Sequence, residues 1–221
     1  MFHANPWAHV RFNTATGQFE ERENPYPKPE SLYRLCDKEH VCEAFVNDFD
    51  VQAYLAQQGA TDVNLAILGQ MAEALEEPVD LGEPQPFARA AQKLLQVCAL
   101  RSSRYIVENA KAFAQEQGKK LMLLLSYSAS DVINACQGKR RFDQSFVDYL
   151  RESNIPFVDT LEKHALDFRS FSGSPSDYVK RYYIGHYNPQ GNHFFAFAIK
   201  DAIVGWLDPK PPTYREEGPL L

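Results

Sequence analysis

The chain has 221 residues, of which 44% are hydrophobic and 24% are charged, a balance typical of globular domains. Its formal net charge of −6 argues against nucleic-acid binding, because phosphate contacts need a clustered excess of Lys and Arg. The short basic run Lys139-Arg140-Arg141 is interpreted as a solvated loop or helix start.

Targeting and metal-binding signals are missing from the sequence. Its four cysteines, at positions 36, 42, 98 and 136, follow no zinc or redox spacing, so we expect reduced thiols and predict neither a metal nor a cofactor. Residues 1–6 lack the apolar core of a signal peptide, and no apolar run reaches the roughly 18–20 residues that a membrane span needs. The localisation stays unknown, with the cytoplasm as the default and no membrane partner expected.

The first 37 residues predict a hairpin followed by an extended arm. Strands are expected at 9–12 and 18–21, with Gly17 as the left-handed turn residue between them. Pro25, Pro27 and Pro29 then alternate, and this spacing excludes a helix.

Residues 38–117 are helical in pattern. Apolar residues recur at steps of three and four over 38–77, a linker with Gly82 spans 78–86, and one long helix or two joined helices follow over 87–117. Gly118 is placed to end the last of them.

The second half of the chain predicts a parallel sheet. The apolar run at 121–126 and the segment at 155–159 are each typical of a buried strand, and a helix is expected between them at about 142–152. Such an order implies helices on both faces of the sheet. Ligands bind at the carboxyl ends of such strands, which here carry Ser126, Tyr127, Ser128, Asp159 and Thr160.

A final helix is expected from Pro189 to 207, with Asn188 as its cap. Its residues are apolar nearly all round, which predicts a largely buried helix. The tail at 209–221 is expected to be extended or disordered.

The candidate catalytic residue is His186, which stands just before this capped helix. A neutral imidazole held there could take a proton from a hydroxyl group. The alternative is that His186 and His193 are loop and helix-surface residues that hydrogen-bond locally. The nearby Tyr178, Tyr182, Tyr183 and Tyr187 could line a sugar or acyl pocket, or pack around the loop.

The order of a strand, a helix, a short strand ending in Asp159, a loop and His-x-Asn-x-x-Gly resembles the second half of SGNH/GDSL-type hydrolases. His186, Asn188 and Gly191 match that motif. The resemblance implies an α/β fold: a three-layer α/β/α sandwich with a mostly parallel, flavodoxin-like sheet over 38–208, and an extra N-terminal hairpin and helices.

The same resemblance implies hydrolysis of a small-molecule or carbohydrate ester, such as removal of an O-acyl group, with His186 as general base. Asn188, Tyr187 and Ser126 are the candidate binding residues.

The chain also departs from this family. It contains neither Gly-Asp-Ser nor a Gly-x-Ser-x-Gly elbow. Tyr183 occupies the position where the family has its catalytic Asp, so Asp177 is the candidate orienting carboxylate.

Three explanations of the missing motif stay open. The chain could be the C-terminal part of a longer hydrolase, it could be a relative that binds without catalysing, or Ser126 or Ser128 could be a new nucleophile.

Because the family's first strand is missing from this chain, apolar edges would be exposed and self-association is expected.

Overall fold

The computed structural model describes residues 9–82 and 84–207, with the side chains of 84–86 excepted. The chain divides into two compact units, Met1–Lys119 and Lys120–Leu221. This division falls inside the range 38–208, for which the sequence predicts one domain. The expected tail at 209–221 lies outside the described residues.

Unit 1 begins with the predicted hairpin. Strand β1 (His9–Asn13) pairs antiparallel with β2 (Gln18–Arg22), and Gly17 adopts φ +67° in the turn. A left-handed backbone at this position favours glycine because a Cβ atom would be strained there. The proline-rich arm follows and leads into a 3₁₀ helix, η1 (Pro29–Cys36).

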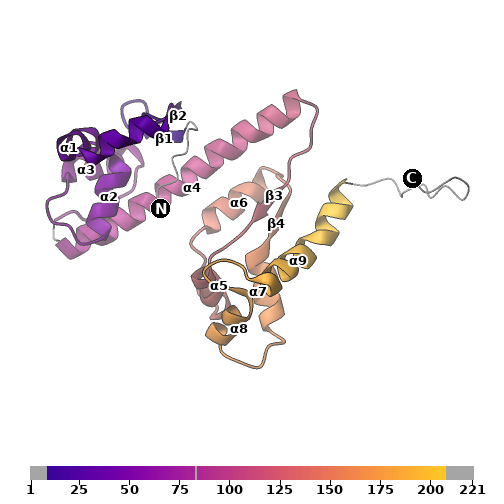
Figure 1. Ribbon diagram of the computed structural model, residues 1–221. Helices are drawn as coiled ribbons and strands as arrows, with labels where there is room; N and C mark the ends of the chain where they lie inside the picture. The colour runs from indigo at the N-terminus through magenta and orange to yellow at the C-terminus, as the bar shows by residue number, and fades with distance from the viewer. Residues whose placement is uncertain (1–8, 83, 208–221) are drawn as a thin grey trace, which may run out of the picture. The chain divides into compact units, whose positions relative to one another are not determined.

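Helices form the rest of unit 1, as predicted, although the last helix begins at Pro84, inside the expected linker 78–86. They are α1 (Lys38–Phe45), α2 (Phe49–Gln57), α3 (Leu65–Ala74) and α4 (Pro84–Glu116). The core lies where α2 and α3 pack on the first half of α4 (Figure 1), and includes Phe49, Leu68, Met71 and Leu94. Gly118 follows α4 with φ +60° and confirms the predicted helix end.

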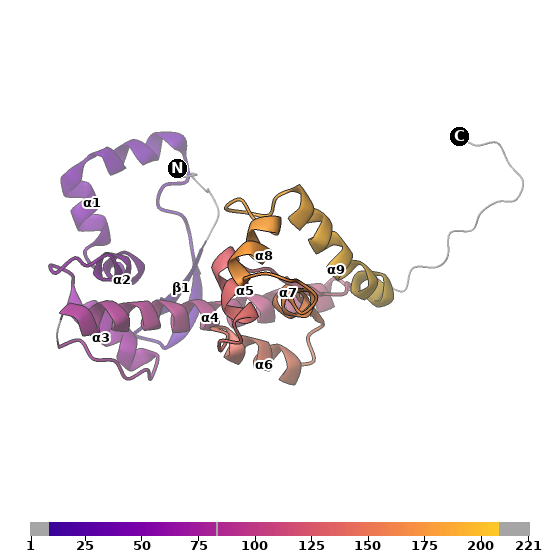
Figure 2. The same ribbon diagram turned by 90° about the horizontal axis from the view of Figure 1, so that it is seen from below.

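Unit 2 contains one β-α-α-β arrangement. Strand β3 (Leu123–Leu125) pairs in parallel with β4 (Phe157–Asp159), and α5 (Ala129–Cys136) and α6 (Gln144–Glu152) connect them. Helices α7 (Thr160–Phe168), α8 (Pro175–Tyr182) and α9 (Pro189–Leu207) follow. Figure 2 looks along α7, with α5, α8 and α9 around it.

The prediction of a three-layer α/β/α sandwich with a mostly parallel sheet is wrong. In the part of the chain that the structure describes, helices dominate and there are only two sheets, each of two strands. The expected crossover exists, but only three residues of each predicted strand pair, and no other strand of the described residues joins them. Leu124 of β3 is accordingly 41% exposed, although the apolar run predicted burial on both faces.

The expectation that the last helix is largely buried is also wrong. In α9 only Gly191 is buried, and Phe197 is 60% exposed. A helix that is apolar nearly all round needs neighbours on every side, whereas α7 and α8 are the main packing partners of α9 in unit 2. Within the described residues, no helix combines the length and apolar character needed to cross a membrane.

A buried ion-pair network fixes the carboxyl ends of the two strands. Arg141 Nε lies 2.7 Å from Asp143 Oδ1, and its Nη1 lies 2.5 Å from Asp159 Oδ2. Tyr127, just after β3, donates to Asp143 Oδ2 at 2.7 Å. The Arg141 side chain is only 13% exposed, so the interpretation of Lys139-Arg140-Arg141 as a solvated run is wrong for this residue.

We predict that Arg141→Met destabilises unit 2 by about 3–5 kcal/mol, because it leaves Asp143 and Asp159 buried without their partner. Arg140→Met is the matched control, since Arg140 is exposed and its loss should change stability little. Urea unfolding of both variants measures the difference. Equal stabilities for the two would contradict the role of the network.

Candidate functional site

The candidate site is the tight loop that joins α8 to α9 and carries His186. Tyr183 and Tyr187 form an antiparallel bridge across this loop, and the Ile184 amide donates to the His186 carbonyl at 2.8 Å. Gly185 adopts φ +93°, a backbone conformation that glycine tolerates best. The loop backbone is therefore fixed by its own hydrogen bonds.

Asn188 and Gly191 of the motif shape this loop. The Asn188 side chain accepts from the Gly191 amide at 2.8 Å, which confirms it as the cap of α9, and donates to the Arg181 carbonyl at 2.9 Å. A Cβ atom on Gly191 would lie 2.2 Å from the Tyr182 carbonyl oxygen, so only glycine fits. Because the Asn188 amide group is engaged in these two bonds, its position is explained without a ligand.

His186 is the exposed member of the motif. Its Nδ1 lies 2.8 Å from the Tyr187 carbonyl oxygen. A carbonyl can only accept, so Nδ1 carries the proton of the neutral ring and Nε2 keeps a lone pair. This is the tautomer that a general base requires.

The structure does not bring Asp177 to His186. Asp177 lies in the first turn of α8, while His186 follows the end of that helix. The Asp177 carboxylate accepts a hydrogen bond from Ser174 Oγ at 2.6 Å and pairs with Lys180 at 3.3 Å. The hydrogen bond from Ser174 is the main cause that lowers the pKa of Asp177. Among the described residues no carboxylate contacts the His186 ring, and the Tyr187 carbonyl holds Nδ1 instead.

The two candidate serines follow β3, but their environments differ. Ser128 caps α5, and its hydroxyl contacts Asp131 Oδ2 at 2.6 Å and Ser130 Oγ at 2.8 Å. Ser126 is exposed directly after the strand. The Tyr183 hydroxyl donates to the Tyr127 carbonyl at 3.3 Å, so the His186 loop is tied to the same strand end as the serines.

A buried histidine, His164 of α7, contacts the His186 loop through the side chain of Tyr187. It has no exposed surface, and the Tyr187 hydroxyl lies 2.8 Å from its Nε2. The Tyr178 hydroxyl lies 3.0 Å from its Nδ1, and Phe194 stacks on the ring with centroids 4.3 Å apart. The tyrosines of this segment therefore pack around His164, and the alternative of a packed loop is the one that the structure supports.

The direction of these hydrogen bonds follows from one carboxylate. Asp167 can only accept, and the Tyr178 hydroxyl donates to it at 3.0 Å. Tyr178 must then accept from His164 Nδ1, and His164 Nε2 must accept from Tyr187. A neutral His164 satisfies every bond of this chain. Burial is the main cause that lowers the pKa of His164 to about 4.

Neither His164 nor the burial of Arg141 is predicted from the sequence. Position 164 stands in the middle of an amphipathic helix, where a histidine gives no signal of its own, and its tyrosine partners lie 14 to 23 residues further on. Arg141 was grouped with its two basic neighbours in sequence, although its partner Asp159 lies 18 residues away. Within the described part of the chain, no cluster of three or more His, Cys, Asp or Glu side chains could hold a metal ion.

We predict that Gly191→Ala destabilises unit 2 by about 1–3 kcal/mol, the usual cost of forcing an extra methyl group into a packed position. Gly205→Ala in the same helix is the control, because its Cβ meets no atom within 4 Å and alanine should stabilise the helix by about 0.5–1 kcal/mol. Thermal unfolding of both variants compares them. A stable Gly191→Ala variant would contradict the close approach to Tyr182.

We also predict that unit 2 loses stability as the pH falls from about 6.5 to about 4. Unfolded His164 binds a proton near its ordinary pKa of 6.5, whereas the folded residue binds one only near 4. The unfolded state therefore gains protons first, and the full window is worth on the order of 3 kcal/mol.

Urea unfolding at pH 7.5 and pH 5 measures this loss. His164→Gln, which stays neutral, should flatten the dependence, and His193→Gln on exposed α9 should leave it unchanged. The same pH dependence in His164→Gln would show that other groups cause it.

Comparisons with known proteins identify no relative of this chain. No family model matches the chain, and no curated protein or solved structure is significantly similar to it.

Proposed function

We propose that the chain carries out ester hydrolysis of the SGNH/GDSL type, with His186 as general base. One observation carries the proposal. Asn188 and Gly191 of His-x-Asn-x-x-Gly are engaged in capping and packing, whereas His186 is exposed, and its bond from Nδ1 leaves the lone pair of the neutral ring on Nε2. Nε2 of His186 is therefore the atom of this motif that is available to take a proton from a hydroxyl group.

In each half of the proposed reaction, His186 Nε2 takes one proton and returns it. This atom takes the proton of a hydroxyl group as the hydroxyl oxygen attacks the ester carbonyl, and returns it to the alcohol that leaves. A water molecule then attacks the acyl intermediate in the same way and restores the hydroxyl. The carbonyl of Tyr187 holds Nδ1 throughout, in the role that a carboxylate has in a Ser-His-Asp triad.

Ser126 is the candidate hydroxyl at this edge. It is exposed after β3, whereas the hydroxyl of Ser128 is engaged with Asp131 and Ser130 at the start of α5. The family that the motif resembles places its nucleophile in Gly-Asp-Ser, which this chain lacks. We therefore propose Ser126 as the nucleophile, and the experiment below tests this assignment.

A second candidate function is a binding domain without catalysis. Apolar side chains of α9 favour it: Phe197, Val204 and Leu207 are 60%, 51% and 53% exposed. Surfaces of this kind are typical of sites that contact another protein. In this reading the His186 loop is a rigid part of a contact surface, and self-association is one of its forms.

The experiment is labelling of the purified chain with a fluorophosphonate probe, which reacts preferentially with activated serines. Intact mass gives the stoichiometry and peptide mapping gives the residue. His186→Gln removes the base and stays neutral, and His193→Gln is the matched control on α9.

We expect one label per chain on Ser126, lost in His186→Gln and kept in His193→Gln. Labelling of another serine with the same dependence on His186 would keep the hydrolase and replace the nucleophile. An unlabelled chain with normal circular dichroism would overturn hydrolysis by this chain and leave the binding domain.

A further inference from the structure

Unit 1 contains a cavity that the proposed hydrolysis does not use. Its volume is about 1100 Å³, and β1, β2, the proline-rich arm and helices α1 to α4 all contribute to its wall. Sites for small molecules in proteins are typically about 300–1,000 Å³, so the cavity can hold a ligand of that class.

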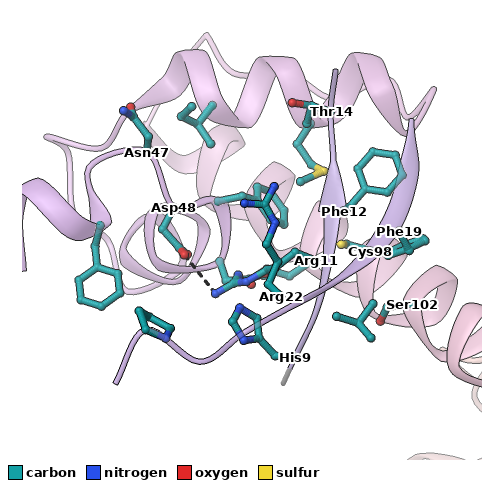
Figure 3. Close-up of a pocket in the computed structure, with 18 of the residues that line it drawn as sticks. His9, Arg11, Phe12, Thr14, Phe19, Arg22, Asn47, Asp48, Cys98 and Ser102 are labelled. Carbon is teal, nitrogen blue, oxygen red and sulfur yellow. Dashed lines mark ion pairs between the residues drawn. The ribbon is translucent and has the colours of Figure 1, made fainter. Parts of the chain in front are cut away.

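The inner wall of the cavity is apolar. Phe12 and Phe19 come from the hairpin, Met71 from α3, and Leu95 and Cys98 from α4. Figure 3 shows Phe12, Phe19 and Cys98 close together on one side of the cavity. Such a wall suits an alkyl chain or another apolar body, because few polar atoms lose water when that body packs against it.

The opposite side of the cavity is polar. His9 stands directly across from Arg22 in the hairpin, and Arg11 points towards the start of α2 (Figure 3). Arg11 pairs with Asp48 at 3.1 Å and also with Asp50, so two carboxylates share one guanidinium. The Arg22 guanidinium pairs with Glu20.

The balance of charge at this side decides which head group fits. Of the charged residues that line the cavity, two are basic, Arg11 and Arg22, and three are acidic, Glu23, Asp48 and Asp50. Burial, with repulsion from Arg11, lowers the pKa of His9, which makes its ring harder to protonate. A ligand anion would face the excess of carboxylates, whereas a ligand cation would complement it.

We propose that this cavity binds a hydrophobic amine, with the ammonium group beside Asp48 and Asp50 and the apolar body against Phe12, Met71 and Cys98. Asp50 is the better partner, because its side chain is 48% exposed while that of Asp48 caps α2 and is 18% exposed.

Cys98 supplies the readout. Its thiol lies in the wall of the cavity, and burial raises its pKa. Cys36 and Cys42 are exposed outside the cavity, and Cys136 lies in unit 2, so the other three cysteines serve as internal controls. The rate of maleimide labelling at each cysteine is measured in the full chain by peptide mass spectrometry.

The probes are octylammonium, octanoate and 1-octanol, which share one chain length and differ in the head group. At an octylammonium concentration about ten times its dissociation constant, labelling of Cys98 should slow by about tenfold and that of the other cysteines should not change. Octanol should protect at higher concentration only, and octanoate should protect least.

Three variants test the two ends of the ligand. Asp50→Asn should weaken protection by octylammonium several-fold and leave protection by octanol unchanged. Ala99→Phe, on the cavity wall, should weaken protection by every probe. Gln92→Phe, exposed on the same helix and outside the cavity, should behave like the unmodified chain.

The proposal is overturned by any of three results. These are no saturable protection of Cys98, equal protection at Cys36, Cys42 and Cys136, and protection by octanoate or octanol as strong as that by octylammonium. Unit 1 holds none of the residues of the proposed hydrolysis, so fluorophosphonate labelling and cysteine protection succeed or fail independently.

Discussion

His164 has no exposed surface, and each of its ring nitrogens is hydrogen-bonded to a tyrosine hydroxyl. These two bonds join three pieces of unit 2: α7, which holds the ring, α8, which holds Tyr178, and the loop that holds Tyr187. A buried polar group is costly unless it is satisfied, so the ring and its partners must fold together. The position of the His186 loop depends on this arrangement.

The dependence reaches His186 through one residue. The side chain of Tyr187 binds His164, and the carbonyl of Tyr187 holds His186 Nδ1 at 2.8 Å. Tyr183 adds a second connection, from the loop to the backbone just after β3. The loop that carries His186 is thus attached through Tyr187 to the buried His164 and through Tyr183 to the backbone just after β3.

Unit 2 uses two different means to keep polar groups in its interior. Around Arg141 the charges are paired, with two carboxylates sharing one guanidinium. Around His164 the ring stays neutral, and burial holds its pKa near 4. The first arrangement persists until a carboxylate is protonated, whereas the second weakens as soon as the pH falls below the ordinary pKa of histidine. Mild acid should therefore weaken the hydrogen bonds of His164 that hold the His186 loop in place.

The sequence by itself determined the local elements. Gly17, Gly118 and the cap at Asn188 fixed a turn, a helix end and a helix start, because those backbone conformations and hydrogen bonds involve neighbours along the chain. The apolar run before Ser126 and the segment ending at Asp159 predicted two strands, and these do pair in parallel.

Only the tertiary structure decided how far these elements assemble. The periodicity of apolar residues shows which faces of an element are apolar, but not which other elements cover those faces. A sandwich was predicted, whereas the sheet has two strands and α9 is largely exposed. Periodicity also gives no sign of which polar side chains meet. Asp177 looked closest to His186 along the chain but serves the start of α8, whereas Arg141 and His164 find partners 14 to 23 residues away. Contacts of that kind are set by packing, which local sequence does not encode.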